Sequence, residues 1–305
     1  MGRFIYSVVA LLGLAATGLR ADVIGASGSG VIYKYSGGTQ TTFASGLYFP
    51  LGLAFDASGN LYEADAFSGN IFKFTPSGSQ STFATGLSEP FGLAFTAAGT
   101  LFEANDEGGD AIDFTSTGSE SVFNSHLAFP TGMAVAANGY LYVADQGSPT
   151  TSTSGVIYKF TRMGDQITFA TGLNDPFGLA FDNSGNLFEA DFLSGTIYEF
   201  APNGSRSIFA SGLSFPVGLA FDGSGNLYEA DYGSGHVYEF APNGTRSTFA
   251  TETAPTFIAI ASGSGSGSGP GGGPSSVPEP RYLLPLADCI AGFLALLRRK
   301  ASPTV

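Results

Sequence analysis

The sequence predicts an all-β protein, a six-bladed β-propeller closed by three N-terminal strands and one C-terminal strand, flanked by a signal peptide and a short apolar C-terminal helix. The first observation is a repeat of about 40 residues. Phenylalanines mark it at spacings of 40, 40, 46, 40 and 40: Phe43, Phe83, Phe123, Phe169, Phe209 and Phe249. The second is that each repeat has four short β-type runs, the strand number of a propeller blade. The third is that the two chain ends supply the strands of one further blade.

One repeat shows the expected order of elements. Its strands are a (Gly218–Phe221), b (Asn226–Ala230), c (His236–Phe240) and d (Ser247–Ala250). Ser-Gly-Asn, Gly-Ser-Gly and Pro-Asn-Gly segments separate them, and these residues accept the positive φ of tight hairpin turns. The Asp-x-Ser-Gly-Asn segments that begin at Asp56, Asp182 and Asp222 are expected to be a–b turns of this kind, rather than calcium loops.

The chain ends fit a sixth blade. Residues 22–26, 31–35 and 41–44 match runs b, c and d, whereas residues 255–261 match run a alone. Pairing them closes the ring and leaves no terminal sheet face unpaired. The expected propeller therefore spans residues 22–261.

Residues 1–21 have the three parts of a secretory signal. Arg3 supplies the positive charge, residues 4–16 are apolar, and a small-residue cleavage site ends at Ala21. We expect a signal peptidase to remove this segment during export across the inner membrane.

The C-terminal residues indicate a second targeting signal. Residues 262–276 are almost wholly Gly, Ser and Pro, the composition of a flexible linker. An apolar run over 282–297 follows, between a short motif and a basic cluster: Val277, Pro278, Glu279 and Pro280, then Arg298, Arg299 and Lys300. This order in residues 277–305 resembles the PEP-CTERM sorting signal of Gram-negative bacteria. The resemblance implies cleavage near the motif by an exosortase and delivery to the cell surface or the extracellular space, for example a biofilm matrix.

The apolar run is short for a transmembrane segment. It has 16 residues, whereas a spanning helix needs roughly 17–25. The basic cluster is expected to stay on the cytoplasmic side by the positive-inside rule. The length favours transient insertion into the inner membrane over a permanent anchor, and the sequence leaves open whether the segment is retained.

Composition excludes several function classes. The chain has 25 acidic and 12 basic side chains, and residues 22–261 keep 23 and six of them, a formal charge of −17. Nucleic acid is therefore not an expected partner, because affinity for phosphates comes mainly from Lys and Arg. Cys289 is the single cysteine and His126 and His236 are the two histidines, too few for a disulfide framework or a three-histidine metal site. No cofactor is expected.

The repeated text Pro-x-Gly-Leu-Ala-Phe-Asp, Gly-Asn-Leu-Tyr-Glu-Ala-Asp and Gly-x-Ile-Tyr-x-Phe resembles NHL repeats and, more loosely, the gluconolactonase/regucalcin propellers. The resemblance implies a ligand site at the channel mouth, built by the d–a and b–c loops. In the second family, acidic or amide residues before the glycine of strand a hold a divalent metal. The matching positions, candidate ligand-binding residues here, are Leu51, Phe91, Thr131, Phe177 and Val217. None is a carboxylate or an amide, so no metal is expected at this mouth.

Strand b carries a repeated acidic pair. Its first position holds Glu63, Glu103, Glu189 and Glu229, and the second, two residues on, holds Asp65, Asn105, Asp145, Asp191 and Asp231. Residues i and i+2 of a strand point to the same face, so the Glu–Asp pairs at 63/65, 189/191 and 229/231 are candidate cation ligands. The alternative, which we favour, is structural: each Glu bonds the backbone of a neighbouring blade and each Asp caps the b–c turn.

Two features indicate binding rather than catalysis. The d–a loops carry apolar side chains in succession: Tyr48, Phe49, Leu51, Phe91, Phe129, Phe177 and Phe215. Those left exposed would form a platform for a peptide or a sugar face. A six-residue insertion within Gln146–Gly155 lengthens one b–c loop on the same face.

The sequence therefore predicts an exported binding or structural module without enzymatic activity, whose partner is a peptide, a glycan or a matrix polymer. The alternative is an extracytoplasmic lactonase- or lyase-like hydrolase. A lyase-like site would need histidines at the mouth, and neither His126 nor His236 fits that position. A purely architectural matrix role is a third possibility.

Overall fold

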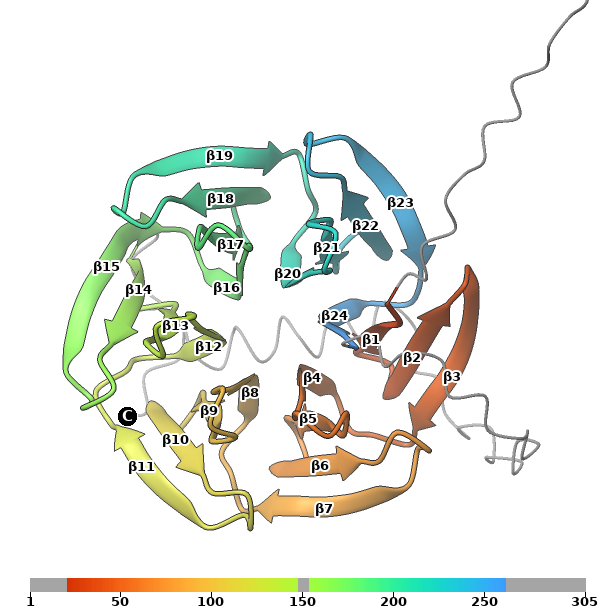
Figure 1. Cartoon of the computed structure of the whole chain (residues 1–305), viewed down its shortest axis with the longest axis horizontal. Coiled ribbons are helices and arrows are strands. Elements are labelled where there is room, and N and C mark those ends of the chain that lie inside the picture. The colour runs from red at the N-terminus through yellow and green to blue at the C-terminus, as the bar shows by residue number, and fades with distance from the viewer. Residues whose placement is uncertain (1–20, 148–153, 262–305) are drawn as a thin grey trace, which may run out of the picture.

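The computed structural model describes residues 21–147 and 154–261, which form a ring of six four-stranded antiparallel sheets (Figure 1). The all-β six-bladed propeller is confirmed. The segments expected as signal peptide, linker, sorting motif and apolar helix lie outside the described residues, apart from Ala21. Within the described residues, no helix is long and apolar enough to cross a membrane.

Each blade contributes its a strand to the centre of the ring and its b strand next to it (Figure 1). From blade 1 to blade 6 the a strands are β4 (Pro50–Phe55), β8 (Pro90–Phe95), β12 (Pro130–Val135), β16 (Pro176–Phe181), β20 (Pro216–Phe221) and β24 (Pro255–Ile260). The b strands are β5 (Leu61–Asp65), β9 (Leu101–Asn105), β13 (Leu141–Asp145), β17 (Leu187–Asp191), β21 (Leu227–Asp231) and β1 (Val23–Ser27).

The c and d strands complete each blade toward its outer edge. In the same blade order the c strands are β6 (Asn70–Phe74), β10 (Asp110–Phe114), β14 (Gly155–Phe160), β18 (Thr196–Phe200), β22 (His236–Phe240) and β2 (Val31–Ser36). The d strands are β7 (Gln80–Thr85), β11 (Glu120–Asn124), β15 (Gln166–Leu173), β19 (Arg206–Ser211), β23 (Arg246–Thr251) and β3 (Thr39–Ser45).

Blade 6 joins the two ends of the described chain. Strand β24 pairs with β1, with Val23 opposite Ile260 and Ile24 opposite Ala259. The Ala261 N–H also donates to the Asp22 carbonyl oxygen at 2.9 Å. The predicted closure by three N-terminal strands and one C-terminal strand is confirmed.

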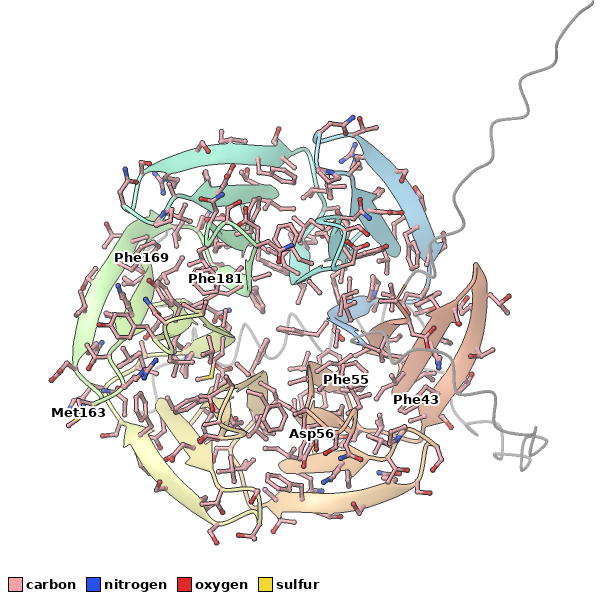
Figure 2. All side chains as sticks on the ribbon, viewed as in Figure 1. Phe43, Phe55, Asp56, Met163, Phe169 and Phe181 are labelled. Carbon is pink, nitrogen blue, oxygen red and sulfur yellow. The ribbon has the colours of Figure 1, made fainter. Side chains whose placement is uncertain are left out.

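Aromatic side chains fill the space between blades. The Tyr142 ring of blade 3 lies 5.1 Å from both Phe169 of its own blade and Phe181 of blade 4, edge to face in each case. Figure 2 labels these two phenylalanines on the neighbouring blades. Phe43 likewise meets Phe74 of the following blade at 5.8 Å. Such pairs add about 0.5–1.5 kcal/mol each beyond their buried area. The phenylalanines that mark the sequence repeat therefore pack the blades against one another.

Glycine brings the a strands into backbone contact around the ring. A Cβ placed on the glycine of each a strand would lie 2.0–2.5 Å from a carbonyl oxygen of the next blade: Gly52, Gly92, Gly132, Gly178 and Gly218. Real side chains do not approach this closely, so only glycine fits. In blade 6 Phe257 takes the corresponding place and packs against Phe91 with ring centroids 5.8 Å apart.

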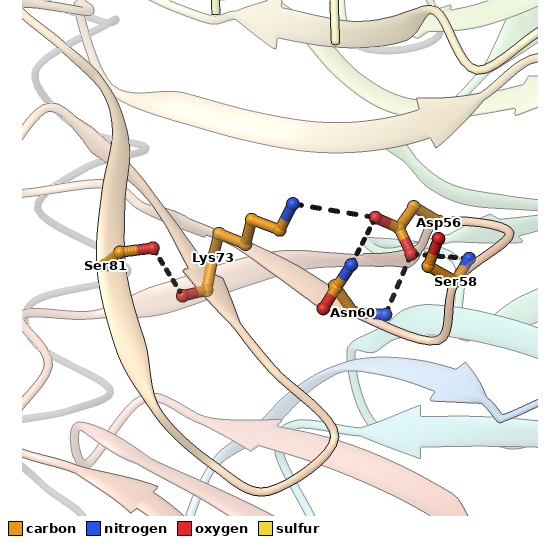
Figure 3. A network of polar contacts seen from close by, with 5 residues as sticks. All are labelled: Asp56, Ser58, Asn60, Lys73 and Ser81. Carbon is orange, nitrogen blue, oxygen red and sulfur yellow. Dashed lines mark hydrogen bonds and ion pairs between the residues drawn. The ribbon is translucent and has the colours of Figure 1, made fainter. Parts of the chain in front are cut away.

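The a–b turns are closed by an aspartate in the way the sequence predicts. Asp56 Oδ1 accepts from the N–H groups of Ser58 and Asn60 at 2.9 and 2.8 Å, and Oδ2 accepts from Asn60 Nδ2 at 2.7 Å (Figure 3). Lys73 Nζ lies 3.8 Å from Oδ2. Partial burial raises the pKa of Asp56, but these hydrogen bonds outweigh it and hold the pKa below its usual value. Asp182 and Asp222 repeat the turn.

Candidate functional site

The five residues predicted at the channel mouth lie at the start of the a strands and are fully buried: Leu51, Phe91, Thr131, Phe177 and Val217. The rings of Phe91 and Phe177 are 5.5 Å apart. The Thr131 hydroxyl donates to the Pro176 carbonyl oxygen of the next blade at 2.8 Å. These side chains fill the centre of the ring, so the exposed part of the face must come from the loops around them.

In five of the six blades, the residue before the proline that begins the a strand is held in a strained conformation. These five residues have positive φ, between 49° and 76°: Phe49, Glu89, Asp175, Phe215 and Ala254. A side chain at positive φ is uncommon, and a following proline disfavours helical conformations further. Strain of this kind costs about 1–3 kcal/mol per residue and clusters at functional sites.

Hydrogen bonds from the b–c loop hold each strained residue. The Ala66 N–H donates to the Phe49 carbonyl oxygen at 3.2 Å. The Tyr232 N–H donates to Phe215 at 3.1 Å, and the same bond recurs in the other blades. The d–a and b–c loops therefore form one rigid rim on this face.

The aspartate at the second acidic position of strand b also links the d–a and b–c loops, and we call this set of hydrogen bonds the clamp. Asp65 Oδ2 accepts from the Tyr48 N–H of the d–a loop at 2.6 Å, and Oδ1 accepts from the Ser68 N–H of the b–c turn at 3.3 Å. Asp145, Asp191 and Asp231 repeat the arrangement. The predicted capping role of the aspartates is confirmed. Burial raises the pKa of Asp65, and its hydrogen bonds offset this only in part.

The glutamates at the first acidic position of strand b do not form the hydrogen bonds that the sequence predicted. Glu63, Glu103, Glu189 and Glu229 have no exposed surface, and their carboxyl oxygens have no hydrogen-bond partner of ordinary geometry within the described structure. The expectation that each Glu bonds a neighbouring blade's backbone is therefore wrong. The backbone group that Glu103 does approach belongs to its own blade: it is the Phe91 N–H, at the bulge where β8 shifts register against β9.

The candidate cation pairs do not form a metal centre in the described structure. The oxygens of Asp65, Asp191 and Asp231 are taken up by backbone N–H groups. In the described ranges, no group of three or more His, Cys, Asp or Glu side chains has an arrangement that could hold a metal ion.

Two aromatic stacks line the rim. On blade 1 the Phe67 ring lies 4.9 Å from Phe49 and 5.4 Å from Tyr48. Across the ring, Phe192 lies 4.9 Å from Phe177 and 4.8 Å from Phe215. The outer members reach solvent: Tyr48 is 61% exposed and Phe215 38%, beside Leu193 at 52%.

Acidic side chains occupy the rim between the two stacks. Glu107, in the b–c loop of blade 2, is exposed, and Asp110 at the start of β10 is half-buried. Asp175, at the strained position of blade 4, is also half-buried. The rim thus offers apolar rings and negative charge together, a pattern suited to a ligand with apolar and cationic groups.

Both histidines lie on the rim loops but outside the two aromatic stacks: His126 is in a d–a loop, and His236 has the c-strand position that Asp110 holds in blade 2. His126 is exposed in the turn after β11, and its N–H donates to Asn124 Oδ1 at 3.0 Å. His236 opens β22, where its ring stacks on Tyr238 and its Nδ1 lies 3.1 Å from Ser234 Oγ. The predicted loop insertion falls largely on residues 148–153, outside the described residues.

The opposite face, formed by a–b and c–d turns, has a depression of about 690 Å³ between blades 2 and 3. Phe102, Phe123 and Val135 contribute apolar surface to it, and Asp113 and Arg162 contribute charge. The Arg162 guanidinium donates a hydrogen bond to the Asn138 carbonyl oxygen at 3.0 Å, so it stabilises the a–b turn of blade 3. This depression has none of the clamped loops of the rim.

The rim loops were predictable from the sequence, but the strained positions within them were not. The X-Pro pair at the start of every a strand marks these positions, and X varies from blade to blade, as do the residues on either side of the pair. Positive φ could not be read from it, because a proline ordinarily pushes the preceding residue toward extended conformations.

Comparisons with known proteins support the architecture. No protein-family model and no curated protein matches this chain. It is similar to a chain of the nidogen–laminin complex, with a TM-score of 0.70 at 23% identity over 79% of this chain and 98% of that one. A gluconolactonase from Xanthomonas campestris gives 0.64 at 15% identity over 81% and 91%. A virginiamycin B lyase from Staphylococcus aureus gives 0.61 at 14% over 80% and 88%. These similarities show the fold alone.

Proposed function

We propose that this protein is a non-enzymatic binding module whose ligand lies on the rim of the d–a and b–c loops. The observation that carries the proposal is the pair of strained positions before proline that reach the surface with different side chains, Asp175 and Phe215, while Phe49, Glu89 and Ala254 are buried beneath the same rim. A repeat protein that keeps its scaffold constant and varies one face concentrates specificity on that face.

The ligand class follows from the rim's chemistry. Exposed Tyr48 and Phe215 offer aromatic surface, and Glu107, Asp110 and Asp175 offer negative charge. The described propeller's excess of acidic side chains repels anionic partners. We infer a peptide segment with aromatic or aliphatic side chains next to Lys or Arg. A neutral glycan would use the aromatic rings without the acidic groups.

Replacing Tyr48 by serine tests the rim directly. Ser88 and Ser214 hold the corresponding d–a position in blades 2 and 5, so the fold should tolerate Tyr48→Ser. We expect basic-apolar peptides on an array to bind the wild type, more weakly as salt rises. Tyr48→Ser should reduce their affinity about tenfold or more, the loss typical of one exposed aromatic anchor. Val122→Ser, at an exposed site on β11, is the matched control and should bind as the wild type does.

A peptide array and a glycan array together distinguish a peptide ligand, a glycan ligand and a purely architectural role. Binding to glycans without binding to peptides would show that the inferred ligand class is wrong. The absence of hits on both would favour a purely architectural role. Turnover of a lactone or of a cyclic ester would overturn the non-enzymatic proposal.

Export and sorting belong to the same proposal. The motif Val277–Pro280, the apolar run and the basic cluster at 298–300 support delivery to the cell surface by an exosortase. We expect deletion of residues 277–305 to abolish C-terminal processing and surface retention while the signal peptide is still removed. Fractionation and mass of the mature chain would check this, and unchanged retention would contradict it.

A further inference from the structure

The buried glutamates of strand b have a counterpart in blade 6. Gly25 has the position in blade 6 that Glu63 has in blade 1. Gly25 pairs with Tyr33, the third residue of c strand β2, just as Glu63 pairs with Phe72, the third residue of c strand β6. A Cβ on Gly25 would lie only 3.0 Å from Oε1 of Glu252, which comes from the loop after β23. Glu252 therefore places its carboxyl group in the space that Gly25 leaves empty. It is 8% exposed.

Five blades thus bury one carboxyl group each at corresponding places, and blade 3 has Val143 instead. None of their carboxyl oxygens has a hydrogen-bond partner of ordinary geometry in the described structure: Glu63, Glu103, Glu189, Glu229 and Glu252. The Phe91 N–H beside Glu103 and the Tyr35 hydroxyl beside Glu252 interact with the carboxyl groups more weakly. A buried carboxylate without hydrogen bonds or a counter-ion is very unfavourable, whereas a neutral carboxylic acid is tolerated.

The charged and titratable groups near each carboxyl do not supply a counter-ion. Glu63 faces Asp65, and Glu103 faces three other acidic groups, Asp106, Asp110 and Glu120. Glu189 and Glu229 each interact unfavourably with an aspartate and, to a smaller extent, favourably with an arginine: Asp191 with Arg206, and Asp231 with Arg246. The two guanidinium groups lie over the rings of Tyr198 and Tyr238. Glu252 faces the hydroxyl groups of Tyr33 and Tyr35.

We propose that these five side chains are neutral carboxylic acids in the folded propeller, and that the ring is therefore a proton-binding element that loosens as the pH rises. It is independent of the rim and of its ligand. Unfolding exposes the five carboxyl groups to water, where each releases its proton. Refolding in neutral solution must take those protons up again.

The pKa values agree in direction. Burial raises the pKa of Glu63, Glu103, Glu189 and Glu229 well above the usual value. It raises that of Glu252 to about 8, and the nearby Tyr35 hydroxyl offsets this only in part. A raised folded-state pKa favours folding fully below the unfolded-state value of about 4.5. That advantage is lost as the pH rises toward the folded-state pKa.

The test measures unfolding of the full chain in urea between pH 5 and pH 8. We expect the unfolding constant to increase with pH, by up to about tenfold per pH unit for each carboxyl that is protonated only in the folded state. Glu63→Gln and Glu189→Gln keep the shape but not the titrating group. Each should remove one such tenfold-per-unit contribution and raise the melting temperature more at pH 8 than at pH 5. Glu199→Gln, a half-buried glutamate on β18, is the control and should leave the slope unchanged.

A second measurement does not depend on the variants folding. At pH 7 exposed Asp and Glu are ionised, so a carboxylic-acid C=O band in the infrared spectrum of the wild type reports the buried groups. We expect such a band, lost on unfolding. Its absence, or glutamine variants that destabilise equally at pH 5 and pH 8, would overturn the proposal. So would a chelator that lowers the wild-type melting temperature, since a bound cation would then be the missing counter-ion.

Discussion

Replacing Gly132 by alanine is expected to lower the free energy of unfolding by at least about 3 kcal/mol, the upper end of overpacking penalties. The added Cβ would lie 2.0 Å from the Phe177 carbonyl oxygen and 3.1 Å from the Gly178 Cα of the next blade. These are backbone atoms of a paired strand, so no flexible side chain can move aside. The blades must separate, and in a closed ring that movement strains the other interfaces. For a propeller of this size the melting temperature should fall by about 10 °C.

Gly223→Ala is the matched control for this prediction. Gly223 lies in an a–b turn and has no positive φ, and a Cβ added there would have no other atom of the described structure within 4 Å. Its replacement should change stability by less than about 0.5 kcal/mol. Urea denaturation of both variants decides the matter. A Gly132→Ala protein as stable as Gly223→Ala would show that the ring centre is not closed by backbone contact.

Replacing Asp231 by alanine is expected to cost about 2–4 kcal/mol, because two backbone donors lose their acceptor. Asp231 is 1% exposed and accepts from the Ser214 N–H at 2.7 Å and the Ser234 N–H at 3.0 Å. Its loss also frees the d–a loop that holds Phe215 at φ 59°. Peptide binding at the rim should therefore weaken together with stability.

Asp231→Asn is the variant that separates the clamp from the charge. Blade 2 already has Asn105 at this position, and its Oδ1 accepts from the Ser88 N–H at 2.7 Å. The asparagine variant should lose less than about 1 kcal/mol, since one strong acceptor remains. Equal destabilisation by alanine and asparagine in urea unfolding would contradict the clamp and indicate that the negative charge itself matters.

The strand pattern was predictable because it is local. The expected c strand, His236–Phe240, coincides with β22. The expected a strand began at Gly218, whereas β20 begins at Pro216, which pairs with Asp231 across a bulge. That pairing depends on the partner strand, and a proline at a strand start gives little sign of it.

The candidate site was predictable only in outline. The capping role of the aspartates follows from a short side chain beside a turn, and Asp65 and Asp231 have that role. The burial of Leu51 and its four counterparts was not foreseen, because it depends on how closely six a strands approach one another.

The sequence by itself determined the repeat, the four strands of each blade and the closure by residues 22–44 and 255–261, because each is a matter of spacing along the chain. Tertiary structure alone decided three things. It closed the ring through glycine contacts, forced side chains before proline to positive φ, and brought Glu252 beside Gly25. The physical reason is shared: each depends on atoms from different strands or blades meeting in space, at distances that no local pattern specifies.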